Sequence, residues 1–175
     1  MKKLFYFTLI LFSFFTSCHD DDNQNPNVLP ETTQVGANTG GALIDGKVWV
    51  AKKEFPDLNP GGNNTEYNSN LEKEYKLRII LNGINSNERI ILYIEDNVEI
   101  TQKKYLFINK NGASYDKNLQ NFFSTKYESK GSITITKFDK KNKFVSGIFH
   151  FEAVNGNGDG TKVVVTEGRF DKKYL

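Results

Sequence analysis

The sequence has little of the chemistry on which many functional sites depend. Its 175 residues include one cysteine, Cys18, one methionine, Met1, and two histidines. A single cysteine excludes an intrachain disulfide and any metal centre built from several thiolates. Because His150 is the one histidine after residue 19, a histidine-centred catalytic or zinc site would have to draw on carboxylates and hydroxyls. We therefore expect no cofactor, no metal and a fold that depends on its hydrophobic core.

The chain also lacks a surplus of either charge. Lys and Arg number 23 against 21 Asp and Glu, and Lys2 and Lys3 lie in the leader identified below. Nucleic-acid-binding domains concentrate basic residues on one face or segment. The lysines that do cluster surround a predicted turn, where such side chains are usually solvated: Lys137, Lys140, Lys141 and Lys143. We expect no nucleic-acid partner.

One long apolar run is present, and it stands at the N-terminus. Residues 4–15 read LFYFTLILFSFF and follow Met1-Lys2-Lys3. A basic start, an apolar run of this length and small residues after it are typical of a secretory signal peptide. As a helix the run would be about 18 Å long against a hydrocarbon core of about 30 Å, too short to span a membrane. Residues 1–17 are therefore predicted to be a signal peptide.

Cys18 follows Thr16 and Ser17 directly. This arrangement resembles a lipobox, the site at which bacterial lipoproteins are cleaved before a cysteine that carries acyl chains such as palmitate, although Phe15 stands where leucine is usual. An ordinary signal peptide with an incidental cysteine is the alternative. Because several acyl chains on one residue give stable anchoring, lipidation of Cys18 predicts a protein held on a membrane by its N-terminus.

Asp20, Asp21 and Asp22 follow the cysteine after one residue. This acidic run resembles the surface-export signal of lipoproteins in the Bacteroidota, which implies an outer-membrane lipoprotein exposed on the cell surface. Three aspartates that merely keep a tether solvated are the alternative, and a protein facing the periplasm would fit that alternative. Residues 18–40 have two prolines, repeated Asn and few large apolar side chains, so they predict an acylated cysteine and a disordered tether.

Residues 41–175 have the pattern of short strands and turns that is typical of an all-β domain. Short β-type runs alternate with Asn, Gly and Asp clusters, and no segment has an apolar period of helical length. Residues 42–51 predict a hairpin across Asp45-Gly46, and strands are predicted at 75–81 and 89–95. Residues 104–108 and 113–115 flank an Asn-Gly turn. We expect a long loop over 55–72 and at most a short turn over 116–123.

The C-terminal third is the clearest part of the pattern. Residues 132–138, 144–153 and 162–170 alternate between apolar and polar side chains, which predicts a three-stranded meander. In the last of these strands either Val163 and Val165, or Val164 and Phe170, would face the core. Seven to nine strands in this length predict a single antiparallel β-sandwich or a small β-barrel, and the sequence leaves the choice between the two open.

Three blocks of the meander carry a family resemblance: GSITITKFD at 131–139, VSGIFHF at 145–151 and VTEGRFD at 165–171. Together with DGKVW at 45–49, they resemble blocks of a family of small all-β lipoproteins of the Bacteroidota whose function is not known. The resemblance covers residues 42–171. It implies the fold and carries over no catalytic or ligand-binding residue.

The segment Asn155-Gly156-Asn157-Gly158-Asp159-Gly160 resembles the first half of a calcium-binding loop, with oxygen side chains at alternate positions and glycine at the sixth. The second half fails, because the twelfth position is Thr166 and Glu167 comes one residue late. A hairpin loop rich in Gly and Asn explains the same residues. We expect the hairpin and leave calcium binding open.

Other candidate groups have equally plain explanations. Glu95, Asp96 and Glu99 offer clustered carboxylates of the kind that glycosidases use, but a solvated strand end also accounts for them. His150 alternates with Phe149 and Phe151 and is expected on the exposed sheet face. Aromatic side chains that could form a sugar-binding platform are more often core: Trp49, Tyr75, Tyr93, Tyr105, Tyr115 and Tyr127.

The sequence therefore predicts a non-enzymatic surface lipoprotein that binds a glycan, a peptide or an envelope protein through its β domain. The alternative is a structural or assembly component of an envelope complex facing the periplasm. A hydrolase is the third hypothesis, but no nucleophile motif, metal signature or cofactor loop favours it.

Overall fold

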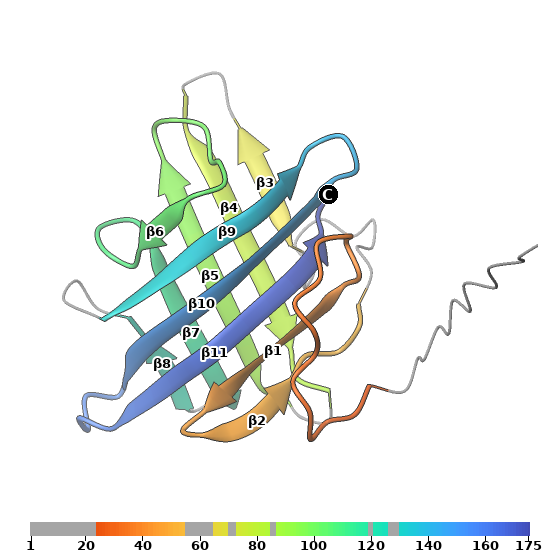
Figure 1. The fold of residues 1–175 in the computed structure, drawn as a ribbon. Helices are drawn as coiled ribbons and strands as arrows, with labels where there is room; N and C mark the ends of the chain where they lie inside the picture. Colours follow the sequence, from red (N-terminus) through yellow and green to blue (C-terminus); the bar gives the residue numbers. More distant parts are fainter. Residues whose placement is uncertain (1–23, 55–64, 70–72, 85–86, 119–120, 126–129) are drawn as a thin grey trace, which may run out of the picture.

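The computed structural model describes residues 24–54, 65–69, 73–84, 87–118, 121–125 and 130–175 (Figure 1). Over these ranges it contains eleven β-strands and no helix. The predicted signal peptide, Cys18 and the acidic run at 20–22 lie outside them. The strands are β1 (Thr39–Ile44), β2 (Lys47–Val50), β3 (Glu66–Ser69), β4 (Tyr75–Asn82), β5 (Arg89–Asp96), β6 (Lys104–Leu106), β7 (Gly112–Asn118), β8 (Asn121–Ser124), β9 (Gly131–Asp139), β10 (Phe144–Asn155) and β11 (Lys162–Lys173).

The strands form one antiparallel sheet that is curled into an open half-barrel. The order is β2-β1-β11-β10-β8-β7-β5-β4-β3, and β9 and β6 branch from β10. In Figure 1, strands β9, β10, β11 and β1 cross in front of β4, β5 and β7. The long strand β10 belongs to both layers, because its first part pairs with β9 while Val154 and Asn155 pair with β8. The prediction of an antiparallel all-β domain is confirmed, and its shape is this half-barrel.

Two further contacts bring the layers together. Near β2, a bridge pairs Ala51 with Gly83, and the amide of Lys52 donates to the carbonyl of Asn82 at 2.7 Å. On the other side, three aromatic rings meet between β3, β9 and the C-terminus: Tyr67 lies 4.9 Å from Phe138 and 5.8 Å from Tyr174 between ring centroids. Edge-to-face rings at these distances pack favourably, so this aromatic group packs β3 against β9 and the C-terminus.

The core fills the space between the layers, and its residues follow the two-residue period of the strands. Ile90, Leu92 and Ile94 of β5 are fully buried, and Phe149 and Phe151 of β10 are 3% and 1% exposed. Trp49 is buried as well, at 7% exposure. The apolar alternation that predicted the meander therefore identified the inward face of β9 and β10 correctly.

Strand β11 buries residues at both odd-numbered and even-numbered positions. Val163 and Val165 face the core, and so does Phe170. Phe149 pairs with Gly168 and Phe151 with Val165, so two residues, Thr166 and Glu167, stand opposite one. This β-bulge shifts the alternation by one residue, and for that reason both registers that the sequence allowed are partly correct.

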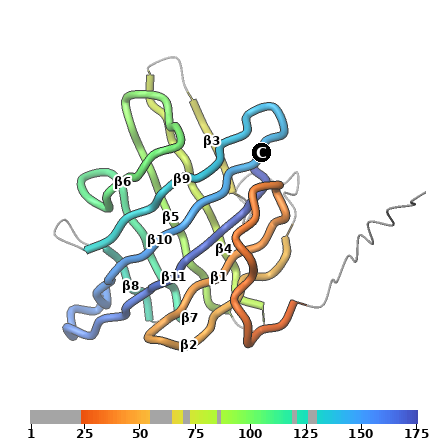
Figure 2. Tube along the Cα trace, in the orientation of Figure 1, coloured from red at the N-terminus to blue at the C-terminus, as the bar shows by residue number. Residues whose placement is uncertain are grey.

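The structure differs from the predicted tether over residues 24–40. Asp171 is 1% exposed, and its carboxylate accepts hydrogen bonds from Thr33 Oγ1 at 2.6 Å, the amide of Gly36 at 2.8 Å and the amides of Val35 and Ala37. This strap, residues 33–37, runs beside β1 to the neighbourhood of the C-terminus (Figure 2). Composition missed the strap because polar groups, not apolar side chains, hold it in place.

Other local predictions have mixed outcomes. The hairpin across Asp45-Gly46 and the meander are confirmed as β1–β2 and β9–β10–β11. The predicted loop 55–72 contains strand β3, and in the segment 116–123 the described residues 116–118 and 121–123 belong to β7 and β8. Strand β6 pairs with β9, whereas β7 pairs with β5 and β8, so the strands flanking Asn111-Gly112 do not form a hairpin. Among the described residues, no helix is long and apolar enough to cross a membrane.

Candidate functional site

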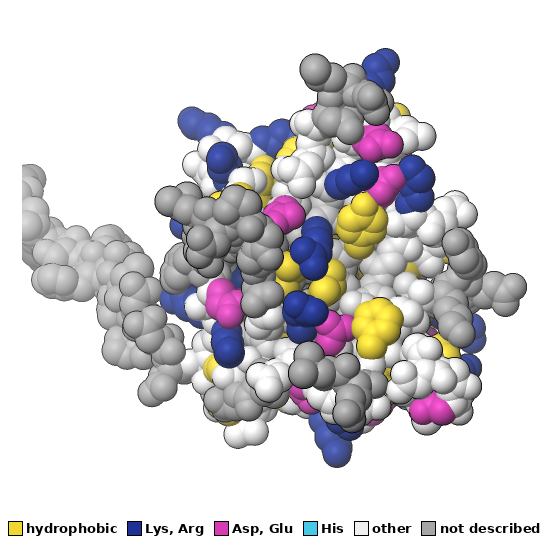
Figure 3. All heavy atoms as spheres, turned by 180° about the vertical axis from the view of Figure 1, so that it is seen from behind, with side chains coloured by type: hydrophobic (Ala, Val, Ile, Leu, Met, Phe, Trp, Pro, Cys, Tyr) yellow, Lys and Arg dark blue, Asp and Glu magenta, His cyan; other side chains and the backbone are white. Residues whose placement is uncertain are grey.

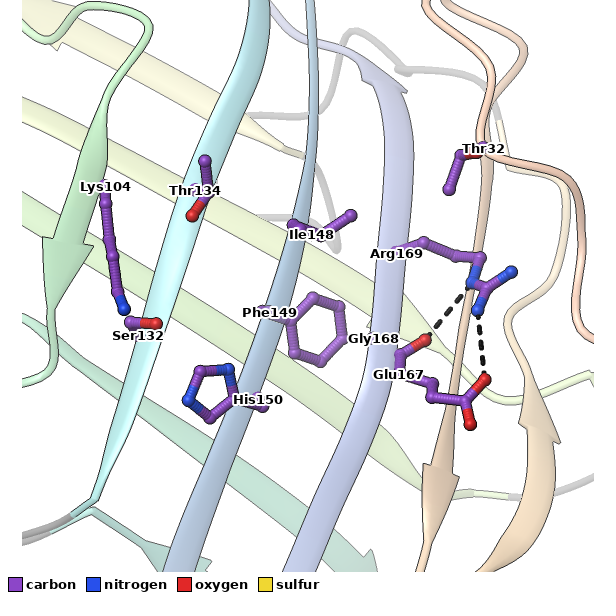
Figure 4. A pocket seen from close by; sticks show the side chains of 10 residues that line it. All are labelled: Thr32, Lys104, Ser132, Thr134, Ile148, Phe149, His150, Glu167, Gly168 and Arg169. Carbon is purple, nitrogen blue, oxygen red and sulfur yellow. Dashed lines mark hydrogen bonds and ion pairs between the residues drawn. The ribbon is translucent and has the colours of Figure 1, made fainter.

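A groove crosses the outer face of β6, β9, β10 and β11 (Figure 4). These strands lie at the front in Figure 1 and are called the front layer. Its residues lie in two rows that run across the strands. In the first row Lys104 of β6, Thr134 of β9, Ile148 of β10 and Arg169 of β11 are successive cross-strand neighbours. In the second row Leu106, Ser132 and His150 are neighbours in the same way. Residues far apart in the chain therefore meet because β9 and β10 lie between β6 and β11.

The groove is formed by short side chains between long ones. Ser132, Thr134 and Gly168 line its middle, and Lys104 and Arg169 stand on either side. Its volume is about 400 Å³, within the range of about 300–1,000 Å³ of small-molecule sites. Three strand spacings separate β6 from β11, so the groove is about 14 Å wide.

The bulge of β11 shapes one wall of the groove. Glu167 has a φ of 50°, which is uncommon in a residue with a side chain. The bulge places Glu167 and Arg169 together on the outer face, where Arg169 donates to the carbonyl of Glu167 at 3.1 Å and to its carboxylate at 3.5 Å. A third bond reaches the carbonyl of Pro30 at 3.4 Å. Arg169 is thus held in position by its neighbours, and its charge is partly neutralised.

Lys104 and His150 are different, because neither side chain has a hydrogen-bond or ion-pair partner within the part of the chain that the structure describes. In Figure 4 the side chain of Lys104 extends toward Ser132, and the ring of His150 lies beside it. Thr32, Ser132 and Thr134 add hydroxyl groups, which can both donate and accept. Ile148, 47% exposed, adds an apolar floor. The groove can therefore hold a polar ligand that carries negative charge.

The carboxylates that the sequence singled out do not form a catalytic pair. Glu95 accepts from Lys110 Nζ and, at 2.7 Å, from Tyr93 OH, while Asp96 pairs with Lys103. Glu99 pairs with Lys140. The hydrogen bonds from Lys110 and Tyr93 lower the pKa of Glu95, so this carboxyl is held ionised. A glycosidase acid needs a raised pKa, which Glu95 does not have, and all three carboxylates are paired with lysines.

The remaining predicted groups are now placed. His150 is exposed on the outer face, as expected, and belongs to the groove. Of the aromatic candidates, Trp49, Tyr105 and Tyr115 are buried. Tyr75 and Tyr93 are half-buried, and Tyr127 lies outside the described residues. The expectation that these aromatic side chains are mostly core is met by Trp49, Tyr105 and Tyr115.

The Asn155–Gly160 segment is a hairpin tip with its own hydrogen bonds. The amide and hydroxyl of Thr161 donate to Asp159 at 2.9 and 2.7 Å, and Asn155 Nδ2 donates to the same carboxylate. The bonds from Thr161 lower the pKa of Asp159. Across the described ranges, no group of three or more His, Cys, Asp or Glu side chains could hold a metal ion.

Sequence reasoning missed Lys104 and Arg169 as groove residues and Asp171 as the residue that holds the strap. Lys104 looked like one more surface lysine, since its neighbours in the groove are distant in sequence. Asp171 and Arg169 did stand in the block VTEGRFD, which was assigned to the fold alone. Burial of Asp171 depends on the strap, and nothing local in the sequence announces it.

Comparison with known proteins gives a family. Residues 63–172 match the family described as a domain of unknown function, DUF6252. The match runs from β3 into β11 and leaves out the hairpin β1–β2, so the DGKVW block lies beyond it. No curated protein and no solved structure matches the chain.

Proposed function

We propose that this chain, which belongs to the DUF6252 family, is an outer-membrane lipoprotein that binds an acidic glycan at the cell surface without catalysing a reaction. The anchor would be Cys18, and the export signal would be Asp20, Asp21 and Asp22. The support for this location is the sequence of the leader and of the acidic run. The finer resemblance to lipoproteins of the Bacteroidota belongs to the same proposal.

The observation that carries the binding role is the convergence of Lys104, His150 and three hydroxyl groups on one groove. An unpaired ammonium favours a carboxylate or sulfate, and hydroxyl groups suit a ligand that is itself rich in hydroxyls. Ile148 offers an apolar patch for the C–H face of a sugar ring.

The strand pairing favours a glycan over an extended peptide. Peptides that bind sheets usually add a strand at an edge and use main-chain hydrogen bonds. The groove lies on the face of β9, β10 and β11, each of which has neighbours on both sides. Recognition there must come from side chains, which suits a hydroxyl-rich ligand.

The binding test is calorimetry with three acidic oligosaccharides: tetragalacturonate, a chondroitin sulfate tetrasaccharide and sialyllactose. We expect at least one to bind and Lys104→Ala to weaken it about tenfold, with Thr134→Val having a smaller effect. Lys141→Ala, on an exposed hairpin tip, is the matched control and should leave affinity unchanged. Failure of all three ligands to bind would contradict the proposal. So would a tetragalacturonate with methylated carboxyl groups that binds as tightly as the best acidic ligand, because it carries no negative charge.

The location is tested by protease treatment of intact cells. Wild-type protein should be digested, a triple Asp20, Asp21, Asp22→Ala variant should be protected, and Cys18→Ala should leave the membrane fraction. If wild type is spared together with a periplasmic control, the surface location is wrong.

That outcome would favour the second candidate, an assembly component of an envelope complex facing the periplasm. Leu106 is 51% exposed and Ile148 47% exposed on the front layer, and exposed apolar side chains of this kind can dock a partner. Cross-linking in cells from a cysteine introduced at Leu106 would then identify the partner. A hydrolase has no support beyond the presence of carboxylates.

A further inference from the structure

A second groove lies on the rear layer, which contains β4, β5 and β7, away from the front groove. Tyr93 of β5 points outward, since its neighbours Leu92 and Ile94 are buried. Its cross-strand partner on β7 is Gly112. Tyr93, Gly112, Thr125 and the segment 107–111 line a cavity of about 540 Å³. On this face, seen in Figure 3, hydrophobic side chains are exposed between basic and acidic ones.

Gly112 keeps this cavity open. A Cβ atom built there would meet one atom within 4 Å, Thr125 Oγ1 at 3.1 Å, so apart from this one close contact the space beside the glycine is open. Because residue 112 lies directly across from Tyr93, a side chain at this position would normally pack against the ring of Tyr93. The glycine therefore leaves the ring uncovered on the side of β7.

The position of the Tyr93 ring is fixed by hydrogen bonds. Its hydroxyl donates to Glu95 Oε2 at 2.7 Å, and Lys110 Nζ donates to the other carboxylate oxygen. Burial, followed by the bond to Glu95, raises the pKa of Tyr93 to about 12, so the phenol stays protonated. A ring held in this way binds a flat ligand at little cost in side-chain entropy.

Two asparagine side chains line the same cavity. Asn111 Oδ1 accepts from the amide of Glu95 at 2.9 Å, which ties the segment 107–111 to β5 and leaves the Nδ2 group of Asn111 for other partners. Asn109, in the same segment, is exposed with a φ of 57°. Its side chain has no hydrogen-bond partner among the described residues.

We propose that this rear groove binds a neutral pyranose unit of a glycan, with the sugar ring stacked on Tyr93 and its hydroxyls bonded by Asn109 and Asn111. An aromatic face accepts the apolar face of a sugar, and amides donate to and accept from hydroxyls. The cations near the groove, Lys110 and Lys76, already face Glu95. A neutral ligand is therefore favoured here, in contrast to the front groove.

The test is calorimetry of the whole domain with four neutral hexasaccharides: cellohexaose, mannohexaose, laminarihexaose and xylohexaose. We expect at least one to bind, and Tyr93→Ala to weaken it tenfold or more, which corresponds to about 1.4 kcal/mol. Tyr93→Phe keeps the ring and should retain most of the affinity. Gly112→Leu fills the cavity and should abolish binding.

Two controls keep the outcomes separate. Lys104→Ala, in the front groove, should leave neutral-sugar binding unchanged, so failure of one groove is distinguished from failure of the other. Should Tyr93→Ala fail to fold, judged by its circular dichroism, Gly112→Leu decides. Absence of binding to all four sugars, or binding that Gly112→Leu leaves intact, overturns the proposal.

Discussion

The carboxylate of Asp171 accepts the hydroxyl hydrogen of Thr33 at 2.6 Å, across 138 positions of the chain. On its other side the same carboxylate accepts from Ser146 Oγ at 2.7 Å. With the three amides of the strap, one buried side chain joins β10, β11 and the segment that precedes β1. The beginning of the described fold thus depends on a residue close to its end.

Removal of this carboxylate should destabilise the domain strongly. In Asp171→Ala the buried donors of the strap and of Ser146 lose their acceptor, and we expect the free energy of unfolding to fall by about 3 kcal/mol or more. Thr33→Val removes one bond and should cost about 1 kcal/mol. Urea unfolding followed by the fluorescence of Trp49 measures both, and equal stability of Asp171→Ala and wild type would show that the strap contributes nothing.

The same residue should make stability sensitive to acid. Burial raises the pKa of Asp171. The hydrogen bonds from Thr33, Ser146 and the strap amides lower it by more than burial raises it, so the native pKa lies below the ordinary value. Its contribution is complete above the unfolded pKa of about 3.9 and is lost as the pH falls through the native pKa. Urea unfolding from pH 7 to 2 should show a steeper loss in wild type than in Asp171→Asn. Asp139 and Asp159, whose pKa values are also lowered, titrate in both proteins and cancel.

Lys172 predicts a change at the alkaline end. It is 4% exposed, and its ammonium donates to the carbonyl of Glu54 at 3.3 Å. Burial lowers its pKa, although the charge of Glu54 opposes this. Because the unfolded chain holds the proton to higher pH, stability should rise with pH between the native pKa and about 10.4. Lys172→Met should remove that rise and be neutral or stabilising at pH 7, and a loss of more than about 2 kcal/mol there would be contrary to this prediction.

Glu167 should be the residue of β11 that best tolerates glycine. Its φ of 50° costs an ordinary side chain about 1 kcal/mol or more. Glu167→Gly should therefore raise the melting temperature slightly, whereas Glu167→Val should lower it, since a β-branched residue fits this φ poorly. If both variants melt alike, the conformation of the bulge differs from the one described.

Gly147 should tolerate no side chain. A Cβ there would lie 2.4 Å from the carbonyl oxygen of Thr134 and 2.7 Å from the ring of Phe170. Gly147→Ala should cost about 1–3 kcal/mol through displacement of β9 or Phe170. Gly112→Ala is the comparison, because its Cβ meets a single atom, Thr125 Oγ1 at 3.1 Å, and it should cost clearly less than Gly147→Ala.

The sequence predicted those parts of the fold whose side chains alternate strictly. The meander β9–β10–β11 was recognisable because Ile133, Ile135 and the phenylalanines of β10 recur with a period of two. Strands β3 and β8 were missed because EYNS and NFFS contain little alternation. The half-barrel itself follows from two residues of β10 that pair with β8, a long-range contact that no local pattern records.

The candidate site was less predictable than the fold. The face of His150 followed from its position between Phe149 and Phe151. The front groove, however, depends on which strands are neighbours, because Lys104 reaches Thr134 through the pairing of β6 with β9. The rear groove depends on an absent side chain, at Gly112, which the sequence pattern had assigned to a turn.

The strap also determines how a mechanical load would enter the domain. A pull on the chain ahead of residue 24 acts first on the bonds from Lys53 to Gln24 and from Arg169 to Pro30, and then on the hydrogen bonds to Asp171, several of which share the tension side by side. The bonds to Asp171 lead to β11 and β10, which have neighbours on both sides, and bypass the edge strand β2. A domain held in this way resists drag on its N-terminal side by shearing central strands, which requires more force than peeling an edge strand one bond at a time.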